Sequence, residues 1–236
     1  MTIAARLTDV HKTYLAGSVA VPALKGINLE IDDGAFLSIA GPSGSGKTTV
    51  LNLLGALDVP STGTIQIGGR TTEGLSPKTL ADFRNTHLGF IFQTFNLIPV
   101  LTVRENVEFP LQLQGMSDKA ERRTRVDDIL GEVGLGELAE RRPLELSGGQ
   151  QQRVAVARAL VKGPTLVLAD EPTANLDSGT AGDVMALMQS MNAKHGTTFV
   201  FSTHDPLVMK HATRLVRLHD GQIESDERVN GGRHGA

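Results

Sequence analysis

The first third of the chain varies between hydrophobic and polar positions in the way that half-buried strands do. Residues 3–14 and 21–31 alternate loosely in polarity, and residues 61–69 place apolar side chains between glycines. These patterns predict strands joined by turns. Phe36–Ala40 is mostly apolar and predicts a short strand, and the apolar residues after it predict a helix over residues 48–57.

Residues 76–162 have the period of amphipathic helices instead. Val126, Ile129, Leu130 and Val133 recur at i, i+3, i+4 and i+7, and Gly134 is a typical residue to end that helix. The expected helix starts are Ser76 before Pro77, Thr102 with Glu105 as a capping box, and Ser117. The pattern therefore predicts a helical region between two strand-forming parts of the chain.

Strand patterns return after residue 165. Residues 166–169 are continuously apolar, as is typical of a strand buried on both faces of a parallel sheet. A helix is predicted at about residues 179–194 and a strand at 198–202. Asp220 and Gly221 predict a hairpin turn, and the polar, glycine-rich segment from Ser225 onward is expected to be disordered.

Composition excludes several classes of protein. The chain has 236 residues, 40% of them hydrophobic, which suits one globular domain or two joined subdomains. It has no cysteine, which excludes disulfides, thiolate metal sites and cysteine catalysis. The net charge of −3 gives no sign of bulk nucleic-acid binding. No apolar run approaches the roughly 20 residues that cross a bilayer, and the first residues lack the apolar core of a signal peptide. We expect a soluble, cytosolic protein that does not bind nucleic acid.

A glycine-rich segment lies between the predicted strand Phe36–Ala40 and the helix after it. It reads Gly41-Pro42-Ser43-Gly44-Ser45-Gly46-Lys47-Thr48, followed by Thr49, and matches the phosphate-binding loop pattern. Small residues let backbone N–H groups curl around a triphosphate, and the start of the helix adds its dipole. Lys47 would bridge the β- and γ-phosphates, and Thr48 would offer its hydroxyl to Mg²⁺. A chance glycine-rich turn is the alternative, and the strand–loop–helix context argues against it.

Two acidic residues, Asp170 and Glu171, end the apolar run 166–169, and Pro172 stops the strand pairing. In an open parallel sheet the ligand site lies beyond the carboxyl ends of the strands. Asp170 is therefore placed to hold Mg²⁺ through a water, and Glu171 to polarise the water that attacks the γ-phosphate. Taken alone, a strand ending in Asp-Glu is more often a solvated turn, but a phosphate loop beside it favours the functional interpretation.

A second anion-binding feature is predicted at Leu146-Ser147-Gly148-Gly149-Gln150. Ser147 is placed to cap a helix that runs through residues 154–161, which leaves free N–H groups and a hydroxyl at the helix start. The alternative is an ordinary helix cap after a flexible turn. We expect that alternative to account for Ser147 but not for two glycines followed by a glutamine.

Residues 146–150 resemble the signature motif of ATP-binding-cassette ATPases, and the other motifs of that family follow in order along nearly the whole chain. Tyr14 resembles the aromatic residue that stacks on adenine. Gln93 resembles the glutamine that touches Mg²⁺ and the attacking water and senses a membrane partner. Asp177 resembles a residue of the loop that crosses the dimer interface, and His204 the switch histidine that contacts the γ-phosphate. Each also has a plain alternative: a strand aromatic, a polar strand end, a helix cap and a turn histidine.

The resemblance implies an α/β fold, a P-loop NTPase core of the RecA type with an N-terminal antiparallel β subdomain. The ATPase domain would span residues 1–225, with a helical subdomain inserted at about 94–162 and a disordered tail at 226–236. In the family, two cassettes pair head to tail, and the phosphate loop of one and residues 147–150 of the other sandwich each ATP. Hydrolysis at Glu171, with Gln93 and His204, then releases the pair and moves a membrane partner. The resemblance implies a homodimer with two competent sites, bound to an integral membrane permease at the cytoplasmic face of the membrane.

Within the family, residues 92–99, 101–107 and 144–145 are most similar to the lipoprotein-release and macrolide-efflux group. The cassettes of that group serve four-helix membrane subunits that move hydrophobic or envelope molecules outward. The Gly- and Glu-rich insertion of fused multidrug exporters is absent, because residues 141–143 stand in its place. One alternative is a soluble cassette protein of DNA repair or ribosome rescue, which would carry coiled coils or a second cassette. Another is a small-molecule kinase, which would have no use for the signature motif.

Overall fold

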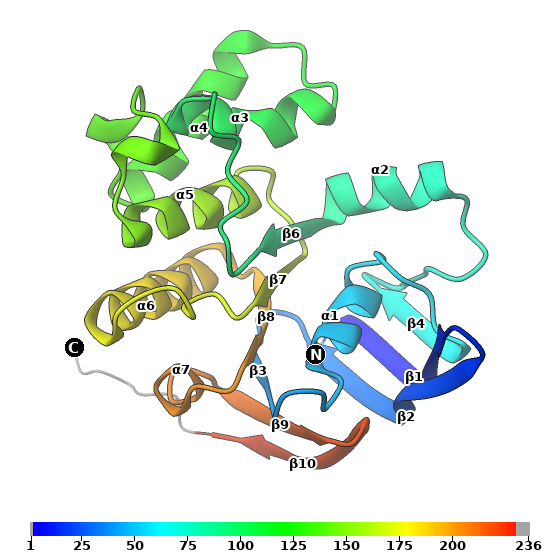
Figure 1. Ribbon diagram of the computed structural model, residues 1–236. Coiled ribbons are helices and arrows are strands. Elements are labelled where there is room, and N and C mark those ends of the chain that lie inside the picture. The colour runs from blue at the N-terminus through cyan, green and yellow to red at the C-terminus, as the bar shows by residue number, and fades with distance from the viewer. Residues whose placement is uncertain (1, 230–236) are drawn as a thin grey trace.

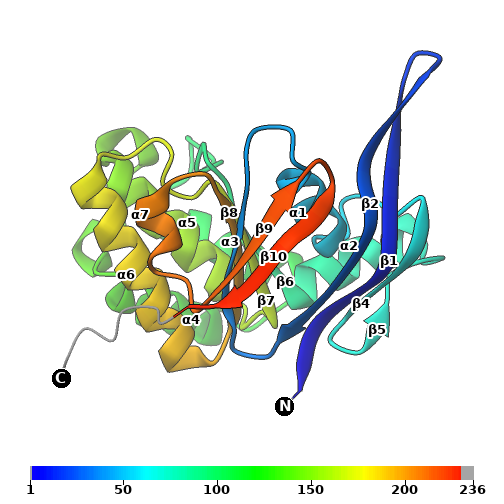
Figure 2. The same ribbon diagram turned by 90° about the horizontal axis from the view of Figure 1, so that it is seen from below.

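The strands of the protein form two sheets in the computed structural model, which describes residues 2–229 (Figure 1). The first sheet is antiparallel, in the order β2-β1-β4-β5. Its strands are β1 (Ile3–Ala16), β2 (Val19–Asp32), β4 (Thr62–Ile67) and β5 (Arg70–Thr71). The end of the β1–β2 hairpin projects beyond the rest of this sheet (Figure 2).

The second sheet has the order β10-β9-β3-β8-β7-β6 and is parallel except for β10, which pairs antiparallel with β9. Alternate side chains of β7 enter different cores: Leu166 and Leu168 one, Val167 and Ala169 the other. The prediction that residues 166–169 are buried on both faces is therefore confirmed. The strands are β3 (Phe36–Ala40), β6 (Leu88–Ile91), β7 (Leu166–Asp170), β8 (Thr198–Thr203), β9 (Arg214–His219) and β10 (Gln222–Arg228).

Helices separate and cover the sheets. The apolar face of α1 (Lys47–Leu54) packs between the two sheets, whereas α5 (Gly148–Leu160) and α6 (Ser178–His195) cover the other face of the second sheet. Figure 1 shows α3 and α4 beyond α5, away from both sheets. The remaining elements are α2 (Pro77–His87), α3 (Val103–Leu113), α4 (Lys119–Glu132), α7 (Pro206–Met209) and the short 3-10 helices η1 (Gly136–Leu138) and η2 (Pro143–Glu145). Across residues 2–229, none of the helices combines the length and apolar character needed to cross a bilayer.

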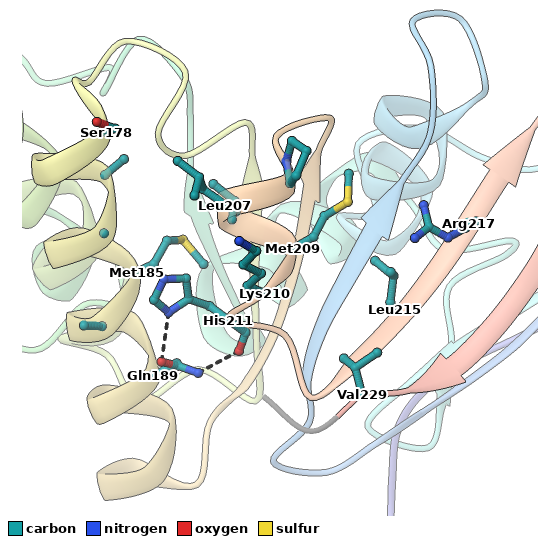
Figure 3. A pocket seen from close by; sticks show the side chains of 15 residues that line it. Ser178, Met185, Gln189, Leu207, Met209, Lys210, His211, Leu215, Arg217 and Val229 are labelled. Carbon is teal, nitrogen blue, oxygen red and sulfur yellow. Dashed lines mark hydrogen bonds between the residues drawn. The ribbon is translucent and has the colours of Figure 1, made fainter. Parts of the chain in front are cut away.

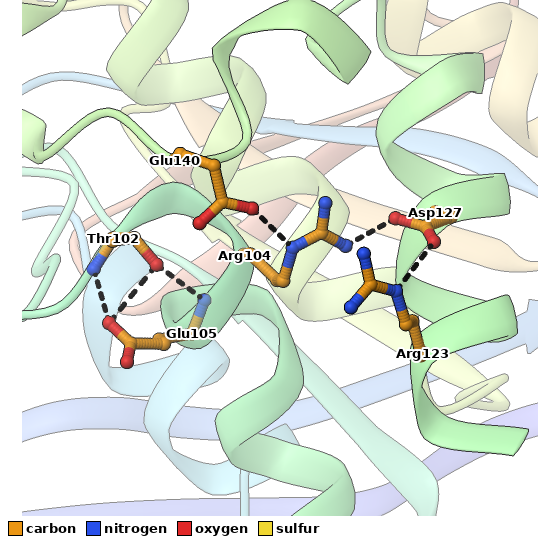
Figure 4. A network of polar contacts seen from close by, with 6 residues as sticks. All are labelled: Thr102, Arg104, Glu105, Arg123, Asp127 and Glu140. Carbon is orange, nitrogen blue, oxygen red and sulfur yellow. Dashed lines mark hydrogen bonds and ion pairs between the residues drawn. The ribbon is translucent and has the colours of Figure 1, made fainter. Parts of the chain in front are cut away.

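Side chains at the start of α3 fix the helical part of the chain. The predicted capping box is confirmed: Thr102 N–H donates to Glu105 Oε2 at 2.7 Å, and Glu105 N–H donates to Thr102 Oγ1 at 3.2 Å. In the same first turn, Arg104 donates to Asp127 of α4 and, at 2.8 Å, to Glu140 after η1 (Figure 4). These ion pairs join α3, α4 and η1 into one unit.

Three local predictions are wrong. Region 76–162 is not helical throughout, because Leu88–Ile91 form β6 and pair in parallel with β7. Helix α4 is capped by Asp118 and not by Ser117, since the Asp118 carboxylate accepts the N–H groups of the first turn. Helix α1 ends at Leu54, because Ala56 takes a left-handed conformation with φ of 49°.

The C-terminal strand also extends further than the sequence suggested. Residues 225–228 belong to β10 and pair with β9, so the expectation of disorder is wrong for them. The guanidinium of Arg214 on β9 holds both carboxylate oxygens of Asp226, at 2.8 and 2.6 Å. Val229 follows the strand and donates its N–H to the carbonyl of Thr213 at 2.9 Å, and the remaining residues of the expected tail, 230–236, lie outside the described residues.

Candidate active site

The parallel register brings the predicted site residues to one edge of the second sheet. Ala40 pairs with Thr203 and Asp170 pairs with Ser202, so β3, β7 and β8 end level with one another. The phosphate loop (residues 41–48) follows β3, Glu171 follows β7, and His204 follows β8. Such an edge is where open parallel sheets bind ligands.

Two glycines give the phosphate loop its path. A Cβ on Gly41 would lie 2.2 Å from the carbonyl oxygen of Leu218, so only glycine fits there. Gly46, with φ of 105°, turns the chain into α1. The nearly buried Lys47 ammonium donates to the carbonyls of Gly41 at 2.8 Å and Pro42 at 2.9 Å. The backbone of the loop thus binds the Lys47 ammonium at the start of a helix.

A buried serine fixes both acidic residues. The Ser202 hydroxyl donates to Asp170 Oδ1 at 2.5 Å, and the Glu171 N–H donates to the carbonyl and the hydroxyl oxygen of Ser202, each at 3.2 Å. Sequence reasoning missed Ser202. Its signal was a hydroxyl directly after the apolar run 199–201 of a fully buried strand.

Glu171 has an uncommon backbone conformation and a direct contact with His204. Its φ is 46°, in the left-handed region, which costs a non-glycine residue of the order of 1–3 kcal/mol. Its Oε1 lies 2.7 Å from Nδ1 of His204. The carboxylate side chain is 19% exposed and the imidazole 69% exposed. A strained acidic residue that contacts a histidine at the carboxyl ends of parallel strands is typical of a catalytic site.

The oxygens of Thr48 and Asp170 fit a magnesium ion. The Thr48 hydroxyl donates to Asp170 Oδ2 at 3.4 Å, so two hard oxygen ligands face each other. Within residues 2–229 there is no group of three or more His, Cys, Asp or Glu side chains that could hold a metal ion. Mg²⁺ usually takes one or two protein ligands together with substrate phosphates. The pair therefore fits a metal that arrives with a nucleotide.

The segment after β6, here called the Gln93 loop (residues 92–97), is fastened from two sides. The exposed Gln93 offers its carbonyl to the side-chain amide of Asn175, at 2.9 Å. Phe95 and Asn96 have left-handed φ values of 58° and 49°, and the Arg158 guanidinium of α5 donates to both carbonyls, at 2.7 and 2.5 Å. Burial lowers the pKa of Arg158. Sequence reasoning missed Arg158, since its partners lie far away along the chain.

Residues 147–150 form a complete capping box at the start of α5. Ser147 Oγ accepts the Gln150 N–H at 3.3 Å, and Gln150 Oε1 accepts the Ser147 N–H at 2.9 Å. A Cβ on Gly149 would lie 2.4 Å from Cγ2 of Thr180, and one on Gly148 would lie 3.2 Å from Leu176. The capping box accounts for Gln150, and the contact with Thr180 accounts for Gly149, so the expectation that an ordinary helix start would explain neither is wrong for these two residues. The approach to the flexible end of Leu176 does not by itself require glycine at position 148.

Asp177 contacts none of the described residues at the sheet edge, whereas Tyr14 interacts with Thr49, the residue directly after the phosphate loop. Asp177 caps α6: its carboxylate accepts the N–H of Thr180 at 3.0 Å and the hydroxyl of Thr180 at 2.6 Å. The Thr180 hydroxyl is the main reason that the pKa of Asp177 is lowered. Tyr14 is 39% exposed on β1, and its hydroxyl donates to Asp58 at 2.8 Å.

A separate apolar pocket of about 800 Å³ lies between α6, α7 and β9 (Figure 3). Met185, Leu207, Met209 and Leu215 contribute apolar side chains to it. None of the predicted site residues lines this pocket, so it plays no part in the site described above.

Comparison with known proteins gives consistent results. The family model described as ABC transporter matches residues 24–174. An uncharacterised ABC transporter ATP-binding protein of Methanocaldococcus jannaschii, MJ0796, is 46% identical over 96% of this chain and 97% of its own length. The dimeric post-hydrolysis structure of that cassette, bound to ADP and Pi, covers 97% of this chain and 100% of its own, with 44% identity and a TM-score of 0.86.

Two groups of named transport proteins are also similar. The lipoprotein-releasing system ATP-binding protein LolD of Anaeromyxobacter dehalogenans is 44% identical over 93% of this chain and 92% of its own length. The macrolide export ATP-binding/permease protein MacB of Syntrophobacter fumaroxidans is 46% identical over 93% of this chain. The chain spans only about a third of the length of the MacB relatives, 31% in this case. On the family match and the long alignments together, the chain belongs to the ABC transporter family of ATP-binding cassettes.

Proposed function

We propose that the chain is the ATP-hydrolysing subunit of a membrane transporter, with ATP as substrate and Mg²⁺ as cofactor. The observation that carries this proposal is the cluster at one sheet edge. There Lys47 lies inside the phosphate loop, Thr48 contacts Asp170, and Glu171 contacts His204.

The residues of the cluster divide the work of hydrolysis. The loop N–H groups and the Lys47 ammonium bind the triphosphate, and Thr48 and Asp170 would hold Mg²⁺. When bound, the metal neutralises charge on the β- and γ-phosphates. Glu171 orients and polarises a water whose oxygen bonds to the γ-phosphorus, while the bond from that phosphorus to the β–γ bridging oxygen breaks. The proton that the water loses ends on the released phosphate. The products are ADP and inorganic phosphate.

His204 and Gln93 are proposed to assist Glu171. The imidazole of His204 lies against the Glu171 carboxylate, so it is placed to orient that carboxylate and to contact the γ-phosphate. Gln93 is exposed at the end of β6, beside the β7 strand that carries Asp170. Tyr14 is proposed to stack on the adenine ring.

Two such subunits are proposed to share each ATP. The N–H groups of Gly148 and Gly149 begin α5 and lack intrahelical acceptors, so they form an anion site at an exposed serine. In the proposed pair, residues 147–150 and Asp177 of one subunit complete the phosphate-loop site of the other. The dimeric structure of the MJ0796 cassette supports this arrangement.

The membrane side of the function rests on the named relatives. The similarity to LolD and MacB supports a place at the cytoplasmic face of a membrane, on a separate permease subunit. It also supports outward movement or extraction of a lipoprotein-like or hydrophobic substrate.

The test is the Glu171→Gln variant. We expect it to bind ATP and to form an ATP-dependent dimer in size-exclusion chromatography, while turnover falls by about 10²–10⁴-fold. Lys47→Ala should weaken ATP binding instead, and Glu137→Gln, which changes an exposed carboxylate on η1, should leave both properties unchanged. Turnover at the wild-type rate in Glu171→Gln would show that Glu171 is not the catalytic carboxylate.

A further inference from the structure

Tyr14 belongs to a cluster with Lys12 and Asp58. Its hydroxyl donates to Asp58 Oδ2 at 2.8 Å, and the Lys12 ammonium donates to Asp58 Oδ1 at 2.6 Å. The same ammonium lies over the Tyr14 ring, 4.8 Å from the ring centroid. The hydroxyl and one face of the ring are therefore both held, which leaves the opposite face for another flat group.

The sequence and the burial explain why this cluster is fixed. Lys12 and Tyr14 are two residues apart on β1, so their side chains point to the same side of the strand. Asp58 lies in the segment after α1, and its Oδ1 also accepts the N–H of Val59 at 2.8 Å, which anchors the carboxylate. Lys12 is only 8% exposed, and a cation that deeply buried needs a counter-charge.

We propose that Lys12 and Asp58 are positioning residues that hold the Tyr14 ring ready for the nucleobase of ATP. This proposal rests on the proposed function. The base stacks on the ring face opposite Lys12, and it meets a side chain that is already ordered. Without the cluster, the ring would lose conformational freedom when the base binds, and the dissociation constant would rise by about two- to tenfold.

A purely structural role makes a different prediction. The ion pair between Lys12 and Asp58 joins β1 to the segment after α1, so it could serve only to hold the first sheet against the helix of the phosphate loop. Loosening that helix would weaken every ligand of the loop equally. A positioning role affects only ligands that carry a base.

The experiment compares ATP with inorganic triphosphate in the double variant Lys12→Met/Asp58→Asn, which leaves no buried charge unpaired. We expect its dissociation constant for ATP to rise by about two- to tenfold, while that for triphosphate stays at the wild-type value. The matched control is Arg6→Met/Glu30→Gln. It removes a different ion pair, 2.8 Å long, which joins β1 to β2, and it should change neither constant.

The single tyrosine supplies a second readout, because the chain has no tryptophan. Burial, and with it the Asp58 carboxylate, raises the pKa of Tyr14. Ultraviolet titration of the single variant Asp58→Asn, which keeps the Lys12 cation, should therefore give a lower tyrosine pKa than the wild type. Equal weakening of ATP and triphosphate, or an unchanged tyrosine pKa, would overturn the positioning role. Failure of the wild type to bind either ligand would instead overturn the proposed function.

Discussion

Gly149→Ala is a sharp test of the packing between α5 and α6. A Cβ at this position would lie 2.4 Å from Cγ2 of Thr180, which is too close for either helix to stay where it is. Thr180 cannot simply rotate, because its hydroxyl donates to Asp177 at 2.6 Å. Overpacking of this kind costs about 1–3 kcal/mol, and the better helix propensity of alanine returns up to about 1 kcal/mol. We expect a net loss of about 0.5–2 kcal/mol in the free energy of unfolding.

In a Thr180→Ser background, Gly149→Ala should raise the free energy of unfolding and not lower it. Serine lacks the Cγ2 methyl but keeps the hydroxyl that donates to Asp177. In that background Gly149→Ala should therefore stabilise the protein by up to about 1 kcal/mol, since only the propensity gain remains. Thermal unfolding of the four proteins measures both effects, because 1 kcal/mol shifts Tm by about 2–4 °C in a chain of this size. An equal loss of stability in both backgrounds would refute the clash with Thr180 as its cause.

The same four proteins separate two roles of Gly149. If packing alone requires glycine there, the Gly149→Ala/Thr180→Ser protein regains turnover together with stability. If the added methyl also blocks the nucleotide of the partner subunit, the protein is stable but has low turnover, and the loss is greatest under conditions where dimers limit the rate. The proposed pairing predicts the second result.

Two further predictions concern dimerisation and pH. Ser147→Arg in a Glu171→Gln chain should abolish the ATP-dependent dimer in size-exclusion chromatography with Mg²⁺ withheld, yet leave monomer binding of ATP nearly intact. Wild-type turnover in the single Ser147→Arg variant would contradict the shared site. Burial opposes ionisation of Glu132, but hydrogen bonds from His195 at 2.6 Å and Lys194 at 3.0 Å outweigh it and lower the pKa of Glu132 below its ordinary value of 4.5. A depressed carboxylate pKa gives stability that is present above the ordinary value and is lost as pH falls through the folded value. Urea titrations of Glu132→Gln should therefore show a deficit at neutral pH that shrinks below about pH 4.5, whereas a deficit independent of pH would contradict the ion pairs as its source.

Contacts between residues that lie a few positions apart could be predicted from the sequence. The caps at Ser76, Thr102 and Ser147 are confirmed, because each side chain accepts an N–H only three residues further on. Strand β6 could not be recognised in the same way. It has four residues, and its stability comes from pairing with β7, which lies beyond the whole helical region.

The candidate site also contains residues that the sequence could predict and residues that depend on distant contacts. The motifs in the sequence predicted residues 41–48, Asp170 and Glu171, the family resemblance added His204, and the structure brings all of them to one edge of the sheet. The residues that hold them in place were missed. Ser202 acts on Asp170 from a neighbouring strand, and Arg158 acts on the Gln93 loop from another helix. Ser202 leaves only its hydroxyl beside an apolar run as a signal, and Arg158 leaves none, because both contacts depend on how distant elements pack.

The contacts of Arg158 with the Gln93 loop have a consequence for communication between the two halves of a transporter. The guanidinium binds the carbonyls of Phe95 and Asn96, and it stands on the same helix whose first turn carries Ser147. In the proposed pair, the Gln93 loop contacts the ATP of its own subunit, whereas the first turn of α5 contacts the ATP of the neighbour. If a permease contacts the Gln93 loop in the proposed transporter, Arg158 would pass a displacement of that loop to α5, and so to the ATP of the neighbouring subunit. One permease contact would then act on both nucleotides.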